Sequence, residues 1–207
     1  FYRMSGHSPI RMPKKGNERF REFIYSRTVV YDDMIQTWSH GIDQRGLKAQ
    51  FVHLGAGYDT RSMQPTRFGF VGDRFEIDHP RVQQIKRDAM ADSPQTGEAL
   101  DHLHFVAVDF EKEGDWRSEL LAQGLDVTQP MIFLWEGVTL YLDGQSILKT
   151  LEEIKTLCED APSGTCTLLT GMYSTQVIDF TYEKSLNKTR KILNMTGESL
   201  KWGLPFE

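Results

Sequence analysis

The sequence predicts an α/β fold, in which a mostly parallel central sheet carries helices on both faces. Short apolar runs alternate along the 207 residues with longer segments of helical periodicity, and this alternation is typical of strand–helix–strand units. The apolar runs are also nearly continuous. Such runs are typical of strands buried on both faces, because helices cover both sides of a parallel sheet.

Five short runs, each mostly apolar or β-branched, are the predicted strands: Gln50–Leu54, Arg74–Ile77, His104–Val108, Met131–Trp135 and Thr165–Thr170. Segments of helical spacing separate them and are predicted helices: Pro80–Met90, Trp116–Gln123 and Gly144–Cys158. Proline is favoured in the first turn of a helix, which supports a start at Pro80. After the last strand we expect a polar helix from Thr175 to about Met195, and residues 93–102 are the expected exposed loop.

Another helix is expected ahead of the first strand, from about Glu18 to Trp38. Its predicted apolar stripe consists of Phe20, Phe23, Ile24, Tyr31, Met34, Ile35 and Trp38. Arg27 falls on the same stripe, one turn after Phe23. A buried guanidinium is costly unless it meets an anion. Arg27 is therefore expected to pair either with a carboxylate at the sheet edge or with the carboxylate of a bound ligand.

Composition narrows the setting. The length suits one domain, and a net charge of −5 argues against a nucleic-acid-binding face or a polybasic membrane anchor. No apolar run is long enough to span a membrane and no signal peptide opens the chain, so we expect a cytoplasmic protein. Cys158 and Cys166 have no His or Cys at metal-ligand spacing, so they are expected to be separate, packed thiols and no metal site is expected.

The stretch "FVHLGAGYDTR" (51–61) ends the first predicted strand in a glycine turn. Gly55 and Gly57 allow a sharp turn and close approach of a ligand to the backbone. A dinucleotide site would place a third glycine at Thr60 and would avoid Asp59, because an acid repels a pyrophosphate. The turn therefore indicates a nucleoside-like ligand that carries a cation, such as S-adenosylmethionine. The alternative is a tight connection without a ligand.

The second strand ends in "RFEIDHP". Strand alternation places Glu76 and Asp78 on one side and Ile77 on the other. Asp78 lies about twenty residues beyond the glycine turn, where an acid holds the ribose hydroxyls of an adenosine group. For Glu76 we favour an ion pair with a neighbouring helix.

The third and fourth strands end in acids as well. Asp109 stands where a carboxylate accepts the amino group of adenine, with Phe110 beside the ring, although Asp109 is equally suited to cap a helix. Glu136 directly follows five apolar residues, and Gly137 leaves the space above it open. A carboxylate there needs a cationic partner, which the methionyl end of the ligand would supply.

Several of these stretches resemble one family. "VHLGAGYDTR", "FEIDHPRVQQIKR", "VAVDF" and "WEGVTLYL" are similar to the leucine carboxyl methyltransferase family of class I S-adenosylmethionine-dependent methyltransferases, and "YSRTVVYDD" resembles the segment before its glycine turn. The resemblance covers roughly Tyr25 to Leu142. It implies a Rossmann-like class I methyltransferase fold with S-adenosyl-L-methionine as cofactor.

The resemblance also implies a role for each site residue. Arg27 would contact the cofactor carboxylate, Asp78 the ribose and Glu136 the methionyl portion, and Tyr141 corresponds to a tyrosine near the substrate. The full expected cofactor set is Arg27, Gly55, Ala56, Gly57, Asp59, Asp78, Asp109, Phe110 and Glu136. A lysine that helps hold the cofactor in the family has no certain equivalent here, since Lys14 and Lys15 fit equally poorly.

The family divides by methyl acceptor, either a small molecule or the C-terminal leucine carboxylate of a phosphatase. The phosphatase branch usually carries a cysteine where Gly137 stands, so we expect an O-methyltransferase that modifies a carboxylate or hydroxyl oxygen of a small molecule. A hydroxyl acceptor needs a general base, and His79 at the ligand rim is the one candidate. His53, His102 and His104 are expected to be satisfied structural histidines. The scarcity of bases favours a carboxylate acceptor. Nothing in the sequence indicates an oligomeric state.

The resemblance suggests three parts within one domain: a helical cap (1–45), a cofactor-binding core (46–171) and a partial substrate lid (172–207). Methyltransferases of this class usually end in an antiparallel pair of strands, for which no room remains after Thr170, so we expect these strands to be missing because the chain is a fragment or lacks residues. Aromatic residues of the last part either line an acceptor pocket or simply pack: Tyr173, Phe180, Tyr182 and Trp202.

Two functions of other classes stay open at this point. A nicotinamide-dependent oxidoreductase shares the sheet, the glycine turn and the acid after the second strand, although Asp59 and the missing third glycine argue against it. A non-catalytic binding module on the same fold is the other.

Overall fold

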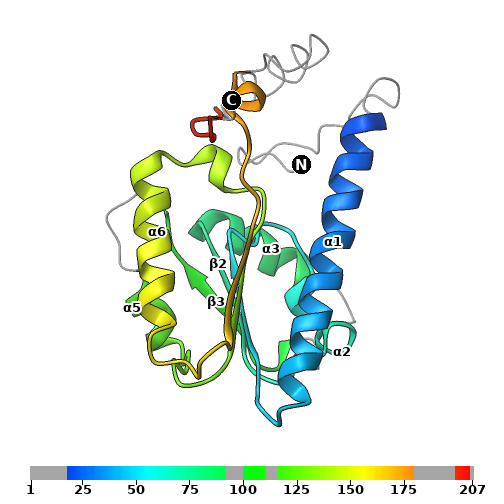
Figure 1. Ribbon diagram of the computed structural model, residues 1–207, viewed down its shortest axis with the longest axis vertical. Coiled ribbons are helices and arrows are strands. Elements are labelled where there is room, and N and C mark those ends of the chain that lie inside the picture. The colour runs from blue at the N-terminus through cyan, green and yellow to red at the C-terminus, as the bar shows by residue number, and fades with distance from the viewer. Residues whose placement is uncertain (1–17, 92–99, 111–115, 180–198, 206–207) are drawn as a thin grey trace.

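The computed structural model describes residues 18–91, 100–110, 116–179 and 199–205. Its centre is a five-stranded sheet in the order β3-β2-β1-β4-β5, and every pair of neighbouring strands is parallel (Figure 1). The strands are β1 (Gln50–Leu54), β2 (Arg74–Asp78), β3 (Leu103–Ala107), β4 (Met131–Trp135) and β5 (Cys166–Thr170). Each predicted strand is confirmed to within one residue at either end.

Helices cover both faces of this sheet, as Figure 1 shows with α1 on one side and α5 and α6 on the other. The helices are α1 (Glu18–Asp43), α2 (Pro65–Phe68), α3 (Pro80–Ala91), α5 (Trp116–Ala122), α6 (Gly144–Leu157) and α7 (Thr175–Ile178). Two short 3₁₀ turns, η1 (Arg61–Met63) and η2 (Thr139–Tyr141), follow β1 and β4. The alternation of strands and helices confirms the predicted α/β, Rossmann-like architecture.

The strands separate two hydrophobic clusters because successive side chains point to opposite faces. Val52 and Leu54 of β1 join the cluster beneath α5 and α6, whereas Phe51 joins the cluster beneath α1 and α2. Strands β1 and β4 are buried along their whole length. The core therefore fixes the central strands firmly, and their ends meet at one edge, which we call the carboxyl edge.

Helix α1 confirms the predicted helix, which continues beyond Trp38 to Asp43, but it confirms the predicted apolar stripe only in part. Tyr31 and Ile35 are buried against the sheet, whereas Phe23 is 48% exposed and Met34 is 45% exposed. The polar side chain of Asp32 is buried instead. Two causes explain the difference. The first turns of α1 extend past the carboxyl edge of the sheet (Figure 1). The helix also turns Asp32 toward the protein interior, where its carboxylate accepts hydrogen bonds from Arg61 and Arg67.

The two cysteines correct a second expectation. Cys158 and Cys166 form a disulfide that joins the end of α6 to the start of β5, with their Cα atoms 5.8 Å apart. The prediction of separate thiols was wrong because it considered metal-ligand spacing and cysteine count alone. A short connection that reverses the chain from helix to strand brings residues eight positions apart into bonding range.

The remaining expectations are tested in part. Beyond β5 the described residues contain α7 and a segment at 199–205 that pairs Leu204 with Ser174, and none of them adds a strand to the sheet. Most of the predicted helix up to Met195 and of the loop at 93–102 lies outside the described residues, as do Phe180 and Tyr182. The division into cap, core and lid stays a prediction. Within the described ranges, no helix has the length and apolar character needed to cross a membrane.

Candidate functional site

The glycine turn at the end of β1 is fastened to the end of β2. The backbone N–H of Gly55 donates to the carbonyl of Ile77 over 2.7 Å, and the N–H of Gly57 donates to Oδ2 of Asp78 over 2.6 Å. Both glycines have positive φ values, +68° and +50°, which glycine adopts without strain. The turn and the acid predicted to hold a ribose are therefore in direct contact.

The two glycines differ in their surroundings. A Cβ atom on Gly55 would overlap the side chain of Val138, whereas a Cβ on Gly57 would have no heavy atom within 4 Å. Gly55 is thus needed for packing between β1 and the segment after β4. Gly57 presents bare backbone to open space, which fits the close approach of a ligand.

Asp78 is half-buried and accepts two backbone hydrogen bonds. Oδ1 accepts from the N–H of His79 over 2.7 Å, and Oδ2 accepts from Gly57. Burial raises the pKa of the Asp78 carboxyl, while the two N–H groups act in the opposite direction. Each carboxylate oxygen can accept more than one hydrogen bond, so both retain capacity for the two hydroxyls of a ribose.

Glu76, the other acid of β2, belongs to the structure rather than to the site. Its carboxylate accepts from Nζ of Lys86 on α3 over 2.6 and 2.7 Å, and from the hydroxyl of Ser62. The expected ion pair with a helix is confirmed. Burial raises the pKa of the Glu76 carboxyl, and the ammonium of Lys86 opposes that shift.

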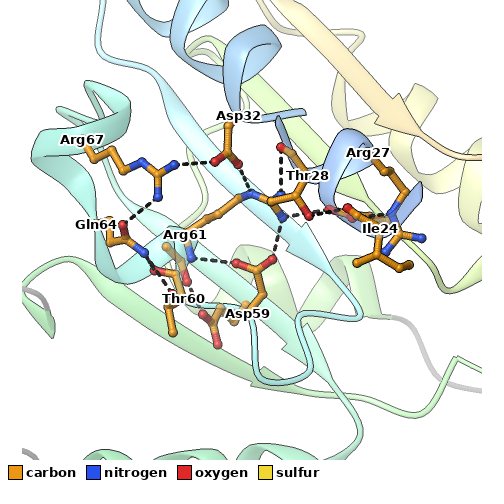
Figure 2. A network of polar contacts seen from close by, with 12 residues as sticks. Ile24, Arg27, Thr28, Asp32, Asp59, Thr60, Arg61, Gln64 and Arg67 are labelled. Carbon is orange, nitrogen blue, oxygen red and sulfur yellow. Dashed lines mark hydrogen bonds and ion pairs between the residues drawn. The ribbon is translucent and has the colours of Figure 1, made fainter. Parts of the chain in front are cut away.

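An arginine that the sequence did not single out lies at the centre of the carboxyl edge. Figure 2 shows Arg61 between α1 and the glycine turn. Its Nε donates to Oδ1 of Asp32 over 2.6 Å, and its Nη1 donates to Oδ2 of Asp59 over 2.5 Å and to Oε2 of Glu136 over 2.8 Å. The side chain is only 6% exposed. The signal that could have found it is the acid two residues earlier in "YDTR".

Neighbouring carboxylates explain why Arg61 stays charged although it is buried. Burial alone would lower the pKa of Arg61, but the carboxylates of Asp59, Asp32 and Glu136 together raise it. Burial pushes the pKa of Asp59 upward, yet the neighbouring His53, the positive charges of Arg61 and Lys86 and a backbone N–H lower it overall. Burial lowers the pKa of His53 to about 4, so His53 is neutral at pH 7 and Arg61 is the main charge that keeps Asp59 ionised.

Arg27 shares the carboxylate of Glu136 with Arg61. Its Nε donates to Oε1 of Glu136 over 2.6 Å, and its Nη1 donates to the hydroxyl of Tyr173 over 2.6 Å. Its guanidinium lies 3.5 Å from the position that a Cβ of Gly137 would take. The first of the two expectations for Arg27, an ion pair at the sheet edge, is confirmed. Glu136 does meet the cationic partner that its place requires, and in this structure the chain itself supplies it, through Arg27 and Arg61.

The residues expected around an adenine lie at the ends of β2 and β3. Nε2 of His79 is 3.8 Å from Oδ2 of Asp109, an ion pair only when the imidazole is protonated. Phe110 packs edge-on against Trp116, with ring centroids 6.4 Å apart. Ala56 is buried in the glycine turn. Tyr141 lies in η2, which follows β4, so it is separated by β1 from the ends of β2 and β3. The structure thus brings His79 close to Asp109.

The three histidines expected to be structural, His53, His102 and His104, divide into two kinds. His102 and His104 both contact Oδ1 of Asp73, at 3.2 and 2.9 Å, and are structural as expected. His53 is buried on β1, and its Nδ1 has no hydrogen-bond partner among the described residues. The expectation that His53 is satisfied is therefore wrong. Among the same residues no cluster of His, Cys, Asp and Glu is arranged to hold a metal ion.

The sequence of this chain matches one protein family and several known proteins. The family model of leucine carboxyl methyltransferase matches residues 4–155. A Bacillus subtilis protein, YktD, is 30% identical over 155 residues, which are 73% of this chain and 48% of YktD. A Rhodococcus jostii protein is 32% identical over 146 residues, 69% of this chain and 45% of its own length. Both carry the provisional name of S-adenosyl-L-methionine-dependent methyltransferase.

The chain spans about half the length of these two relatives. Among solved structures, an O-methyltransferase family protein from Burkholderia thailandensis aligns with a TM-score of 0.49 at 14% identity, over 85% of this chain and 47% of that chain. The family match covers most of the chain and includes the glycine turn, the acid of β2 and Glu136. By this match, the chain belongs to the leucine carboxyl methyltransferase family.

Proposed function

We propose that this chain is the cofactor-binding part of an S-adenosyl-L-methionine-dependent O-methyltransferase. The observation that carries the proposal is the contact between Gly57 and Asp78, because it combines bare backbone with a ribose-binding acid at adjacent strand ends. Family membership supports the same cofactor.

The residues present fit this cofactor. Asp78 keeps acceptor capacity for two ribose hydroxyls, and Asp109 and Phe110 frame the adenine. Arg27 would bind the carboxylate of the cofactor and Glu136 its ammonium, in place of the present pair between Arg27 and Glu136. Gly55, Ala56, Gly57 and Asp59 form the turn along which the cofactor lies.

The cofactor, when bound, supplies an electrophilic methyl group on a sulfonium. The contribution of the chain is to fix this group in line with the acceptor oxygen and to exclude water. We propose a carboxylate of a small molecule as the acceptor, because a carboxylate is already a nucleophile at pH 7 whereas a hydroxyl needs a base. His79 is the candidate base for a hydroxyl, and Tyr141 is the candidate for the substrate side. The C-terminal leucine carboxylate of a protein is the alternative acceptor.

Ligand titration by calorimetry tests the cofactor. S-adenosylhomocysteine should bind the wild-type chain, and Asp78→Asn should weaken binding by about ten- to 100-fold, the range of a hydrogen bond to a charged group. Asp88→Asn, on the exposed face of α3, is the matched control and should bind as wild type. Binding of NADH in place of S-adenosylhomocysteine would establish the oxidoreductase alternative instead.

A second assay tests the acceptor. Incubation with methyl-labelled S-adenosylmethionine and a cell extract should label a small molecule, and mild base should release the label if the product is a methyl ester. A base-stable product would indicate a hydroxyl acceptor, and a labelled protein would favour the leucine branch. Cofactor binding without transfer to any acceptor would support a binding module.

A further inference from the structure

Arg61 and Arg27 hold opposite oxygens of one carboxylate, but their surroundings differ. Arg27 is 22% exposed and donates to Oε1 of Glu136, whereas Arg61 is 6% exposed and donates to Oε2. Arg27 is thus the arginine that a ligand can reach. Arg61 lies in the interior behind the same carboxylate.

Arg61 also joins three separate segments of the chain. Its donors reach Asp32 and the carbonyl of Thr28 on α1, Asp59 in the glycine turn and Glu136 after β4. A planar guanidinium can serve several acceptors in fixed directions, whereas the ammonium of a lysine is a compact charge on a flexible stem. The arrangement therefore depends on arginine chemistry and not on positive charge alone.

Within the part of the chain that the structure describes, Arg61 belongs to a network of ion pairs with equal numbers of carboxylates and guanidinium groups. Three carboxylates, from Asp32, Asp59 and Glu136, are paired with three guanidinium groups, from Arg27, Arg61 and Arg67. Figure 2 labels the three arginines together with Asp32 and Asp59. When a zwitterionic ligand draws Arg27 to its own carboxylate, Glu136 loses one partner and keeps the other. Arg61 then holds Glu136 in place for the ammonium of the ligand.

We infer that Arg61 is a positioning residue for the amino-acid portion of the cofactor, which it serves by holding Glu136 and Asp59 in place while Arg27 exchanges its partner. This inference rests on the proposed function. It assigns to Arg61 no contact with the adenosine portion, because Asp78 and the ends of β2 and β3 serve that portion.

Two ligands separate the roles. S-adenosylhomocysteine carries the amino-acid portion, and 5′-methylthioadenosine lacks it. With Arg61→Lys, calorimetry should show a loss of at least about ten-fold in affinity for S-adenosylhomocysteine, as expected when charge-assisted hydrogen bonds lose their geometry. The affinity for 5′-methylthioadenosine should change less than two-fold.

Arg67→Lys is the matched control, because Arg67 donates to the other oxygen of Asp32 but is 52% exposed. It should bind both ligands as wild type. If Arg61→Lys does not fold, Asp32→Asn removes one carboxylate from Arg61 without altering a strand end, and the same selective loss is expected.

Equal affinities of wild type and Arg61→Lys for S-adenosylhomocysteine would overturn the inference, and so would an equal loss for both ligands. In either case the wild type still binds S-adenosylhomocysteine and the proposed function stands. A wild-type chain that binds neither ligand defeats the proposed function and this inference with it.

Discussion

Two buried basic side chains near the end of β1 illustrate how differently single residues are accommodated. Arg61 meets three carboxylates and stays charged. His53 is equally buried, but its Nδ1 finds no partner in the described part of the chain. Desolvation favours the neutral form of a buried base. His53 is consequently a residue whose protonation opposes folding.

The pH dependence of His53 follows from this shift. Its pKa is about 4 in the folded chain and 6.5 in the unfolded chain, so the unfolded state takes up the proton first as the pH falls. The stabilising contribution of neutral His53 is complete above pH 6.5 and is lost between pH 6.5 and 4. The loss amounts to about 3 kcal/mol.

Urea denaturation of wild type and His53→Gln at several pH values between 7 and 4 measures this contribution. The difference in unfolding free energy between the two proteins should change steadily over that range. Taking the difference matters because the raised pKa values of Glu76 and Asp78 affect stability in the opposite sense. Parallel curves for the two proteins would show that His53 does not titrate in this way.

At the scale of elements, α3 is joined to β2 by charge as well as by packing. Nζ of Lys86 contacts both oxygens of Glu76, and Nε2 of Gln83 donates to the carbonyls of Glu76 and Val106. Both partners of the ion pair are buried. Removing one partner of such a pair leaves an uncompensated charge, which is more costly than removing both.

Replacing Lys86 by methionine should therefore lower the free energy of unfolding by about 3–5 kcal/mol at pH 7. Arg81→Met, on the exposed side of α3, should change it by less than about 0.5 kcal/mol. Combining Lys86→Met with Glu76→Leu should recover part of the loss. Chemical denaturation measures the free energy of unfolding of all three variants. If Lys86→Met is as stable as Arg81→Met, the ion pair between Lys86 and Glu76 contributes little to stability.

At the scale of the whole molecule, the disulfide acts on the unfolded chain. Cys158 and Cys166 are eight residues apart, so the bond closes a short loop and stabilises the fold by about 2–3 kcal/mol in the chain-entropy description. A reductant should lower the urea midpoint of the wild type accordingly. The variant with serine at both positions should not respond to reductant, and two titratable thiols in the unreduced wild type would exclude the bond.

The sequence predicts the sheet well for a physical reason. Strands buried on both faces are continuous apolar runs that end abruptly at glycine or acid, as at Gly55 and Glu136. Prediction was weaker where a residue is placed by partners remote in sequence. The buried face of α1 depends on Asp32 reaching Arg61 and Arg67, and the disulfide depends on the path of one connection.

The candidate site shows the same difference between features set by local sequence and features set by remote partners. The acids after β2, β3 and β4 could be assigned to one edge because parallel strands end together. Arg61 could not, since its three carboxylate partners come from α1, the glycine turn and the end of β4. Spacing in the sequence predicts which residues lie at the carboxyl edge of the sheet. Ion pairs with residues remote in sequence decide which of those side chains are free to bind a ligand.

The strand order has a consequence for synthesis of the chain on the ribosome. β1 pairs with β2 soon after it emerges, but its other side pairs with β4, where Gln50 is opposite Met131. At about 5–20 residues per second, several seconds pass before that second neighbour exists. During this interval one side of a hydrophobic strand has unpaired backbone groups, and such an edge favours aggregation.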